Sequence, residues 1–279
     1  MGLLPVIVNN GQPALDRCAD ALRDVGAVSV VVGPAYGQSV QDTYTDWHDF
    51  FEKGPRDKYT ANSSGLDGLF PYACETAKGA SAPDPKEFYH YFAWGRCPPD
   101  IQQRTRTVFA PLADLAAGII AAVGRQVTKR PGFARLKRDV VENCPNLVLR
   151  ITRYIGPRSE VQFLNSVHHD INYLTLLPAA TGPGLQIQTR DRTWVDVAPR
   201  WSCVTVLCGD MLAEATRGEF IATPHRVLAR RYGLGSGRMS LSFFANPSSS
   251  TRLSPRHTAS SYLKERLAEV GLSAYSANP

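Results

Sequence analysis

The sequence predicts a mainly β protein with flanking helices, built around a core of jelly-roll type. Short runs of strand character follow one another at fairly even intervals in the second half of the chain, and turn residues separate them. The 22 glycines and 20 prolines suit a loop-rich β fold better than a helical bundle. With 279 residues, 43% of them hydrophobic, the chain is long enough to bury a sizeable core.

The first 145 residues are predicted to form a mixed part of strands and helices. Apolar residues at helical spacing indicate an amphipathic helix near the start and a long helix near the end of this part. Gly26 marks the end of the first helix. The expected elements, in chain order, are a strand at 3–8, a helix at Asp16–Val25, a buried strand at Val28–Val32, a helix at Trp47–Phe51, a loop at Ser63–Pro85 and a helix at Gln102–Val127.

The rest of the chain is dominated by predicted strands. They lie at Leu147–Tyr154, Leu174–Leu177, Leu185–Gln188, Trp194–Val197, Cys203–Leu207, Arg226–Leu228 and Met239–Phe244. A final helix, at about Ser260–Val270, has apolar residues along one face. We therefore expect one folded unit, 1–279, with a mixed N-terminal part (1–145), a jelly-roll core (146–250) and a C-terminal helical segment (251–279).

Composition argues against several classes of protein. The formal net charge of +6 comes from scattered basic residues without the aromatic platforms of single-strand binders, so we expect no nucleic-acid partner. Six widely spaced cysteines without a CxxC pair favour free thiols in a reducing compartment. The N-terminus is unlike a signal peptide and no stretch is expected to span a membrane. We expect a cytoplasmic protein, free of membranes, that acts as a monomer.

The segment VHHDINYLTLL contains the candidate metal ligands. Side chains alternate between the faces of a strand, so His168 and Asp170 are expected to point one way and His169 the other. His225, in TPHRVLA, is the best candidate for a third ligand because the chain has only six histidines. Two imidazoles and one carboxylate fill one face of an octahedron and leave three positions open, which is typical of non-haem iron(II) oxygenases.

A candidate carboxylate receptor lies further along, in RMSLSFFANP. Arg238 and Ser240 fall on one face of the predicted strand, where a guanidinium beside a hydroxyl is a good receptor for a carboxylate. Tyr154, at the end of LRITRY, is a candidate third donor from a neighbouring strand. An HxD pair alone occurs often by chance, so this second group strengthens the metal-site prediction.

These segments together resemble a known family. ITRY, HHDINYLTLL, GPGLQIQ, TWVDVAP, GDMLAEATRGEFIATPHRV and RMSLSFFANP are similar, in the same order, to segments of the iron(II)- and 2-oxoglutarate-dependent oxygenases of the isopenicillin N synthase-like family. LFPYACETAKG and DPKEFYHY resemble segments of its N-terminal half. The resemblance implies a double-stranded β-helix core, O₂ as co-substrate, Fe(2+) bound by His168, Asp170 and His225, and 2-oxoglutarate bound by Tyr154, Arg238 and Ser240.

The resemblance also implies an activity. The chain would be an oxidoreductase that activates O₂ to oxidise a C–H bond of a small molecule by hydroxylation, desaturation or ring formation. We expect a role in natural-product metabolism, such as antibiotic biosynthesis. Two alternatives stay open: an oxidase like isopenicillin N synthase, which uses iron and O₂ without 2-oxoglutarate, and a non-catalytic jelly-roll binding protein.

Candidate substrate residues come from two strands or loops. Tyr89 and Tyr91 lie in a region that often lines the cavity in the family, although ordinary packing aromatics are an equally good interpretation. Alternation along the strand places Arg150 and Thr152 on the same face as Tyr154. Arg150 would then be buried and would need an anion, from the substrate or from the protein.

Overall fold

The computed structural model of the chain describes residues 4–8, 11–61, 66–76, 83–127, 145–155, 163–229 and 237–269. The strands are β1 (Val6–Val8), β2 (Ala27–Val31), β3 (Gly68–Phe70), β4 (Lys86–Tyr91), β5 (Val148–Tyr154), β6 (Phe163–His168), β7 (Leu174–Pro178), β8 (Leu185–Gln188), β9 (Trp194–Asp196), β10 (Cys203–Cys208), β11 (His225–Leu228) and β12 (Arg238–Ala245). The helices are α1 (Gln12–Val25), α2 (Pro34–Lys53), α3 (Arg56–Tyr59), α4 (Pro99–Gln126), α6 (Asp210–Thr216) and α7 (Ala259–Glu269).

Two β-sheets form the centre of the molecule. The larger has the order β1-β2-β10-β7-β12-β5-β4-β3, and the smaller has the order β6-β11-β8-β9. From β5 onward the chain passes back and forth between the two sheets, with β5, β7, β10 and β12 in one and β6, β8, β9 and β11 in the other. This is a double-stranded β-helix, so the predicted fold class is confirmed.

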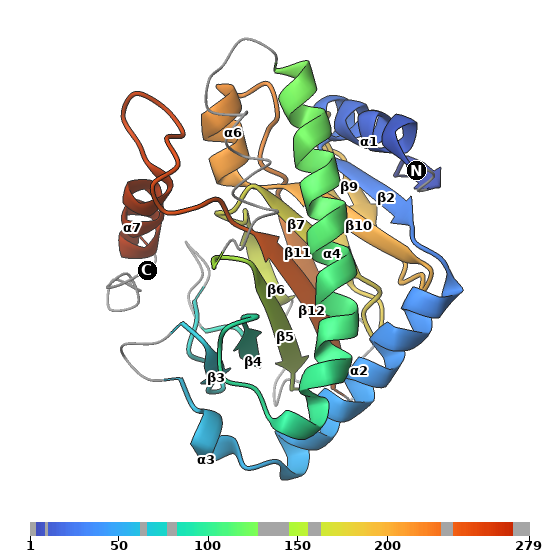
Figure 1. Ribbon diagram of the computed structural model, residues 1–279, viewed down its shortest axis with the longest axis vertical. Coiled ribbons are helices and arrows are strands. Elements are labelled where there is room, and N and C mark those ends of the chain that lie inside the picture. Colours follow the sequence, from blue (N-terminus) through green and yellow to red (C-terminus); the bar gives the residue numbers. More distant parts are fainter. Residues whose placement is uncertain are drawn as a thin grey trace.

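The N-terminal part completes the larger sheet at both edges. Strand β2 pairs antiparallel with β10, and β4 pairs antiparallel with β5. Helix α4 crosses the outer face of this sheet, and α1 and α2 pack beside it (Figure 1). The side chains between these helices and the sheet form the main hydrophobic core.

By length and composition alone, helix α4 is long and apolar enough to cross a membrane. Length and composition alone do not test the expectation that no stretch spans a membrane. Val108, Leu112, Ile119 and Val123 on α4 are buried in the main core. Packing against the larger sheet therefore accounts for the apolar character of the helix.

Most predicted elements of the core are confirmed, and three predictions about the N-terminal part need correction. The helix expected at Trp47–Phe51 is the last part of α2, which begins at Pro34 after Gly33, whose φ of 98° suits glycine. The stretch expected to be a loop contains β3. Strand β4 was not predicted, because KEFYHY is buried along nearly its whole length and lacks the polar–apolar alternation of a half-buried strand.

Two other outcomes concern the ends of the chain and the thiols. The predicted final helix corresponds to α7, and Val270 lies outside the described residues. The described cysteines are free thiols, as expected, and Cys144 lies outside the described residues.

Candidate active site

Three side chains converge between the two sheets. His168 is the last residue of β6, His225 is the first of β11, and the two are register partners. Asp170 Oδ1 lies 3.6 Å from His168 Nε2, and Asp170 Oδ2 lies 3.5 Å from His225 Nε2. Two ligand atoms that each lie about 2.1 Å from one ion are at most about 4.2 Å apart, so these distances suit a shared metal.

Each ligand candidate is oriented by a second contact. The Nδ1 atoms of His168 and His225 lie 2.8 Å and 3.1 Å from the carbonyl oxygens of the residues two positions before them, Ser166 and Thr223. An Nδ1–H that donates to a carbonyl leaves Nε2 as a free lone pair facing the centre. The Thr175 hydroxyl donates to Asp170 Oδ2 at 2.5 Å.

The protonation states also suit metal binding. Burial, with His225 beside it, lowers the pKa of His168 to about 3, so its imidazole is neutral at neutral pH. Burial alone favours the protonated form of Asp170, but the neighbouring His225 and His168 outweigh it and hold the pKa of Asp170 below its ordinary value. Neutral imidazole and ionised carboxylate are the forms that bind metals.

His168 and His169 point in different directions, as predicted, but the predicted strand does not extend to Asp170. His169 points away from the cluster, and its Nδ1 lies 3.5 Å from Asp210 Oδ1. Asp170 was expected on the same strand as His168, but β6 ends at His168 and Asp170 lies in the segment that follows. Simple strand alternation therefore does not place Asp170. Its backbone carbonyl accepts a hydrogen bond from Asp210 N at 2.8 Å, which ties this segment to the start of α6.

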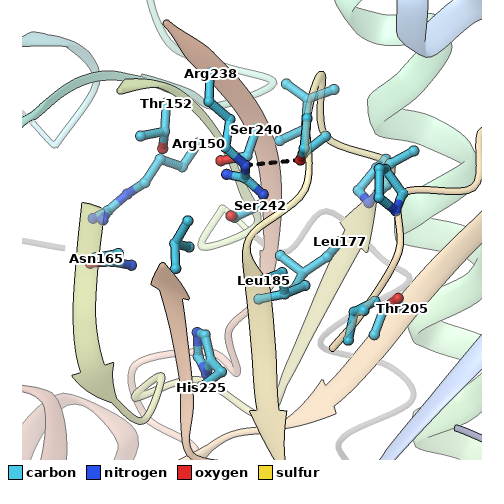
Figure 2. A pocket seen from close by; sticks show the side chains of 18 of the residues that line it. Arg150, Thr152, Asn165, Leu177, Leu185, Thr205, His225, Arg238, Ser240 and Ser242 are labelled. Atoms are coloured by element: carbon cyan, nitrogen blue, oxygen red, sulfur yellow. Dashed lines mark hydrogen bonds between the residues drawn. The ribbon is translucent and has the colours of Figure 1, made fainter. Parts of the chain in front are cut away.

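The candidate carboxylate receptor lines the same cavity as the metal-ligand candidates (Figure 2). Arg238 on β12 pairs in register with Tyr154 on β5, and Ser240 pairs with Thr152. Arg238 is 4% exposed, and its Nε donates to the Gly182 carbonyl oxygen at 3.1 Å. Its Nη1 has no hydrogen-bond partner among the described residues. A buried guanidinium without a carboxylate partner requires an anionic ligand, which fits the far carboxylate of 2-oxoglutarate.

The cavity lies between the two sheets and is lined by residues of both. Arg150 and Thr152 line it, as strand alternation predicted. The anion that Arg150 needs is supplied by the protein, since Glu75 accepts two hydrogen bonds from its guanidinium at 3.0 Å each.

The expectation that Tyr89 and Tyr91 contact substrate is wrong. Both are fully buried on the opposite face of the larger sheet, within the main hydrophobic core. The Tyr89 hydroxyl donates to the Arg96 carbonyl oxygen at 2.7 Å, and its ring packs 4.6 Å from that of Trp47. Because β4 is a strand, its alternate residues face the cavity side instead.

Lys86 on β4 is a residue of the cavity wall that was not predicted from the sequence. It pairs in register with Tyr154, and its Nζ lies 3.0 Å from Asp84 Oδ2, 3.2 Å from Glu75 Oε2 and 3.0 Å from Asn165 Oδ1. Recognising KEFYHY as a strand beside LRITRY would have placed it there. Burial favours the neutral form of Glu75, but Arg150 and Lys86 outweigh it and lower the pKa of Glu75 to about 2.

Comparisons with known proteins agree with this geometry. A family model described as the 2OG-Fe(II) oxygenase superfamily matches residues 146–247. Gibberellin 2-beta-dioxygenase 3 of Arabidopsis thaliana is 39% identical over 88 residues, which are 32% of this chain and 25% of that protein. Gibberellin 2-beta-dioxygenase of Phaseolus coccineus is 32% identical over 143 residues, 49% of this chain and 41% of that protein. The matched regions thus span less than half the length of these curated relatives.

Solved structures match over nearly the full length. A putative oxygenase from Shewanella oneidensis is 30% identical, with a TM-score of 0.79, and the match covers 97% of this chain and 100% of that one. A putative 2OG-Fe(II) oxygenase family protein from Caulobacter crescentus is 21% identical, with a TM-score of 0.78 and the same coverage.

Proposed function

Since the chain belongs to the 2OG-Fe(II) oxygenase superfamily, we propose that it uses iron(II), 2-oxoglutarate and O₂ to oxidise a C–H bond of a small molecule. One observation carries the proposal. A complete set of two histidines and one aspartate shares a cavity with a buried arginine that has no carboxylate partner among the described residues. The first group fits iron(II) with open positions, and the second fits the free end of a dicarboxylate.

The roles of the residues follow from their positions. His168, Asp170 and His225 hold the metal, and Arg238, Ser240 and Tyr154 hold the far carboxylate of 2-oxoglutarate. When bound, iron(II) supplies the chemistry that couples conversion of 2-oxoglutarate and O₂ to succinate and CO₂ with oxidation of the substrate. The two sheets exclude water from this reaction and keep the substrate C–H bond in place.

The substrate class rests on the relatives. Gibberellin dioxygenases and a 1-aminocyclopropane-1-carboxylate oxidase are named for reactions of small molecules. We extend this to a small-molecule substrate from natural-product metabolism, oxidised in the cytoplasm by a monomeric enzyme. An oxidase that works without 2-oxoglutarate would release no succinate, which separates that alternative from our proposal.

The experiment combines two readouts and a matched pair of variants. Anaerobic titration with iron(II) and 2-oxoglutarate should give a visible charge-transfer band, and a panel of small metabolites should show substrate-dependent succinate release. His225→Ala should lose both signals. His169→Ala, the neighbouring histidine that points away from the cluster, should keep both. A His225→Ala variant that retains the band and the succinate would contradict the proposed metal site.

A further inference from the structure

Two of the arginines that line the cavity, Arg238 and Arg150, are in opposite electrostatic states. Arg238 has no carboxylate partner among the described residues, and its Nη1 lacks a hydrogen-bond acceptor there. Arg150 forms a two-point ion pair with Glu75, with both nitrogen–oxygen distances at 3.0 Å. In the same cavity, therefore, the Arg238 guanidinium has no anionic partner among the described residues, whereas Glu75 neutralises the Arg150 guanidinium.

The two arginines serve different parts of the cavity. Arg150 pairs in register with Ser242, which lies four residues beyond Arg238 on β12. At about 3.4 Å per residue, the row of register partners that contains Arg238 and the row that contains Arg150 lie about 14 Å apart along the strands. The four C–C bonds of 2-oxoglutarate, each about 1.5 Å, span at most about 6 Å. A 2-oxoglutarate molecule bound at Arg238 therefore ends before the row of Arg150, which is left to the substrate.

The guanidinium of Arg150 is held firmly in place. It lies 4.1 Å from the centre of the Phe88 ring and 5.3 Å from that of Phe244. Its Nε donates to His90 Nε2 at 2.8 Å, and His90 Nδ1 lies 3.0 Å from the Leu66 carbonyl oxygen. This arrangement requires a neutral His90 with its proton on Nδ1, and burial together with Arg150 lowers the pKa of His90 to about 3.

Three of the five N–H groups of Arg150 are used in these contacts. The remaining two have no acceptor among the described residues, while Arg150 itself lines the cavity. Glu75 is not among the lining residues, so it neutralises the guanidinium from behind. Its backbone is fixed as well, since Asp84 N donates to the Glu75 carbonyl oxygen at 3.0 Å.

Lys86 offers the substrate no free charge. Its three N–H groups match three acceptors, on Asp84, Glu75 and Asn165. Arg200 also lines the cavity, but it is an exposed residue. The charges of Arg150 and Lys86 are thus balanced by Glu75 and Asp84.

The charges around the metal and 2-oxoglutarate are also balanced when both are bound. Iron(II) and Arg238 carry three positive charges, and Asp170 and 2-oxoglutarate carry three negative charges. Among the described residues, the exposed Arg200 is then the cation of the cavity wall left without a carboxylate partner, so burying a substrate carboxylate away from it would be costly. An uncharged acceptor, such as an amide or ketone oxygen, would satisfy the remaining N–H groups of Arg150 without that cost.

We infer that the substrate is an uncharged polar molecule whose carbonyl-type oxygen accepts hydrogen bonds from Arg150, with its apolar part against Phe244. This inference rests on the proposed function and specifies the substrate class of the same site. Arg150 is then a substrate-binding residue, and Glu75 is the residue that sets the selectivity for uncharged over anionic substrates.

The test compares amides with the carboxylic acids of the same shape. Benzamide and benzoate, phenylacetamide and phenylacetate, and nicotinamide and nicotinate are titrated calorimetrically at neutral pH into anaerobic enzyme loaded with iron(II) and 2-oxoglutarate. For the pairs that bind, we expect the amide to bind about tenfold or more tightly than the acid. Glu75→Gln removes the counter-charge of Arg150, so it should reverse this order. Arg150→Gln should abolish amide binding.

Glu87→Gln is the matched control. Glu87 is also a buried carboxylate that pairs with arginines, but on β4 it faces the other side of the sheet, toward Arg56 and Arg153. This variant should lose stability and keep the preference for amides. The charge-transfer band with 2-oxoglutarate reports in each variant that the metal half is intact.

Three results would overturn the inference. They are acids that bind the wild type as tightly as amides, a Glu75→Gln variant with unchanged preference, and no binding of any amide by enzyme that shows the band. Failure of the proposed function would look different, since the band itself would be absent.

Discussion

Replacing Arg238 with methionine should weaken the binding of 2-oxoglutarate without destabilising the ligand-free protein. Methionine keeps much of the volume of arginine but has no charge and no N–H groups. In the structure Arg238 is 4% exposed, with one hydrogen bond to a backbone carbonyl and the Tyr154 ring 5.3 Å from its Cζ. The buried charge of Arg238 therefore destabilises the ligand-free protein, and a bound anionic ligand would offset this destabilisation.

The magnitudes follow from this environment. Removing one partner of a buried ion pair costs about 3 to 5 kcal/mol, so the Kd for 2-oxoglutarate should rise by a few hundredfold to a few thousandfold. Without ligand, replacing an uncompensated buried charge by an apolar side chain stabilises a protein by about 1 to 4 kcal/mol, less about 1 kcal/mol for the lost hydrogen bond. The net change is about 0 to 3 kcal/mol, so at about 2 °C per kcal/mol we expect the Tm of the ligand-free variant to stay the same or to rise by up to about 6 °C.

The assay is an anaerobic titration with 2-oxoglutarate, followed by the charge-transfer band, together with thermal unfolding of the ligand-free protein. Arg153→Met is the control, because Arg153 neighbours the same strand pair but faces the other way, where it pairs with Glu52 and Glu87. It should lose stability and keep its affinity for 2-oxoglutarate. An Arg238→Met variant with wild-type affinity, or with a large loss of ligand-free stability, would refute the reasoning.

Three further predictions concern the surroundings of the site. Thr175→Val removes the hydroxyl that donates to Asp170, so calorimetry should show a metal affinity about 10- to 100-fold lower; an unchanged affinity would show that this contact does not orient the ligand. The pKa of Glu75, about 2, lies below its ordinary 4.5, so its ionised form stabilises the fold above pH 4.5 and this stability is lost as the pH falls toward 2. Urea unfolding should show the wild type losing roughly 3 kcal/mol relative to Glu75→Gln across that window, and a constant difference would contradict it. Tyr89→Phe removes a buried hydrogen bond away from the cavity, so it should cost about 1 kcal/mol of stability, and any change in 2-oxoglutarate affinity would argue against the placement of Tyr89.

The local pattern of the chain predicted the core strands well. Each of the seven strands expected after residue 146 overlaps an observed strand, because turn residues separate short β-branched runs there. Strand β4 escaped prediction for a physical reason. Lys86 and Glu87 read as surface residues, yet both are buried. Lys86 forms ion pairs with Asp84 and Glu75, and Glu87 forms ion pairs with Arg56 and Arg153, which are far away in the sequence.

Residue spacing and family resemblance identified the principal side chains of the candidate site by themselves. His168, Asp170, His225 and Arg238 were selected from the sequence, and the structure brings all four to one cavity. The chemistry of a metal site restricts its residue types, so few alternatives existed among six histidines. Strand alternation also placed Arg150 on the cavity face.

Only the tertiary structure decided what surrounds those side chains. Glu75 and Arg150 are 75 residues apart, and Lys86 and Asn165 are 79 residues apart, so no local pattern reports that they pair. Whether a buried guanidinium meets a carboxylate or stays free depends on these long-range contacts. The sequence alone therefore determined the fold class and the reactive groups. The fold determined which charges are balanced, and with them the substrates that the cavity is able to accept.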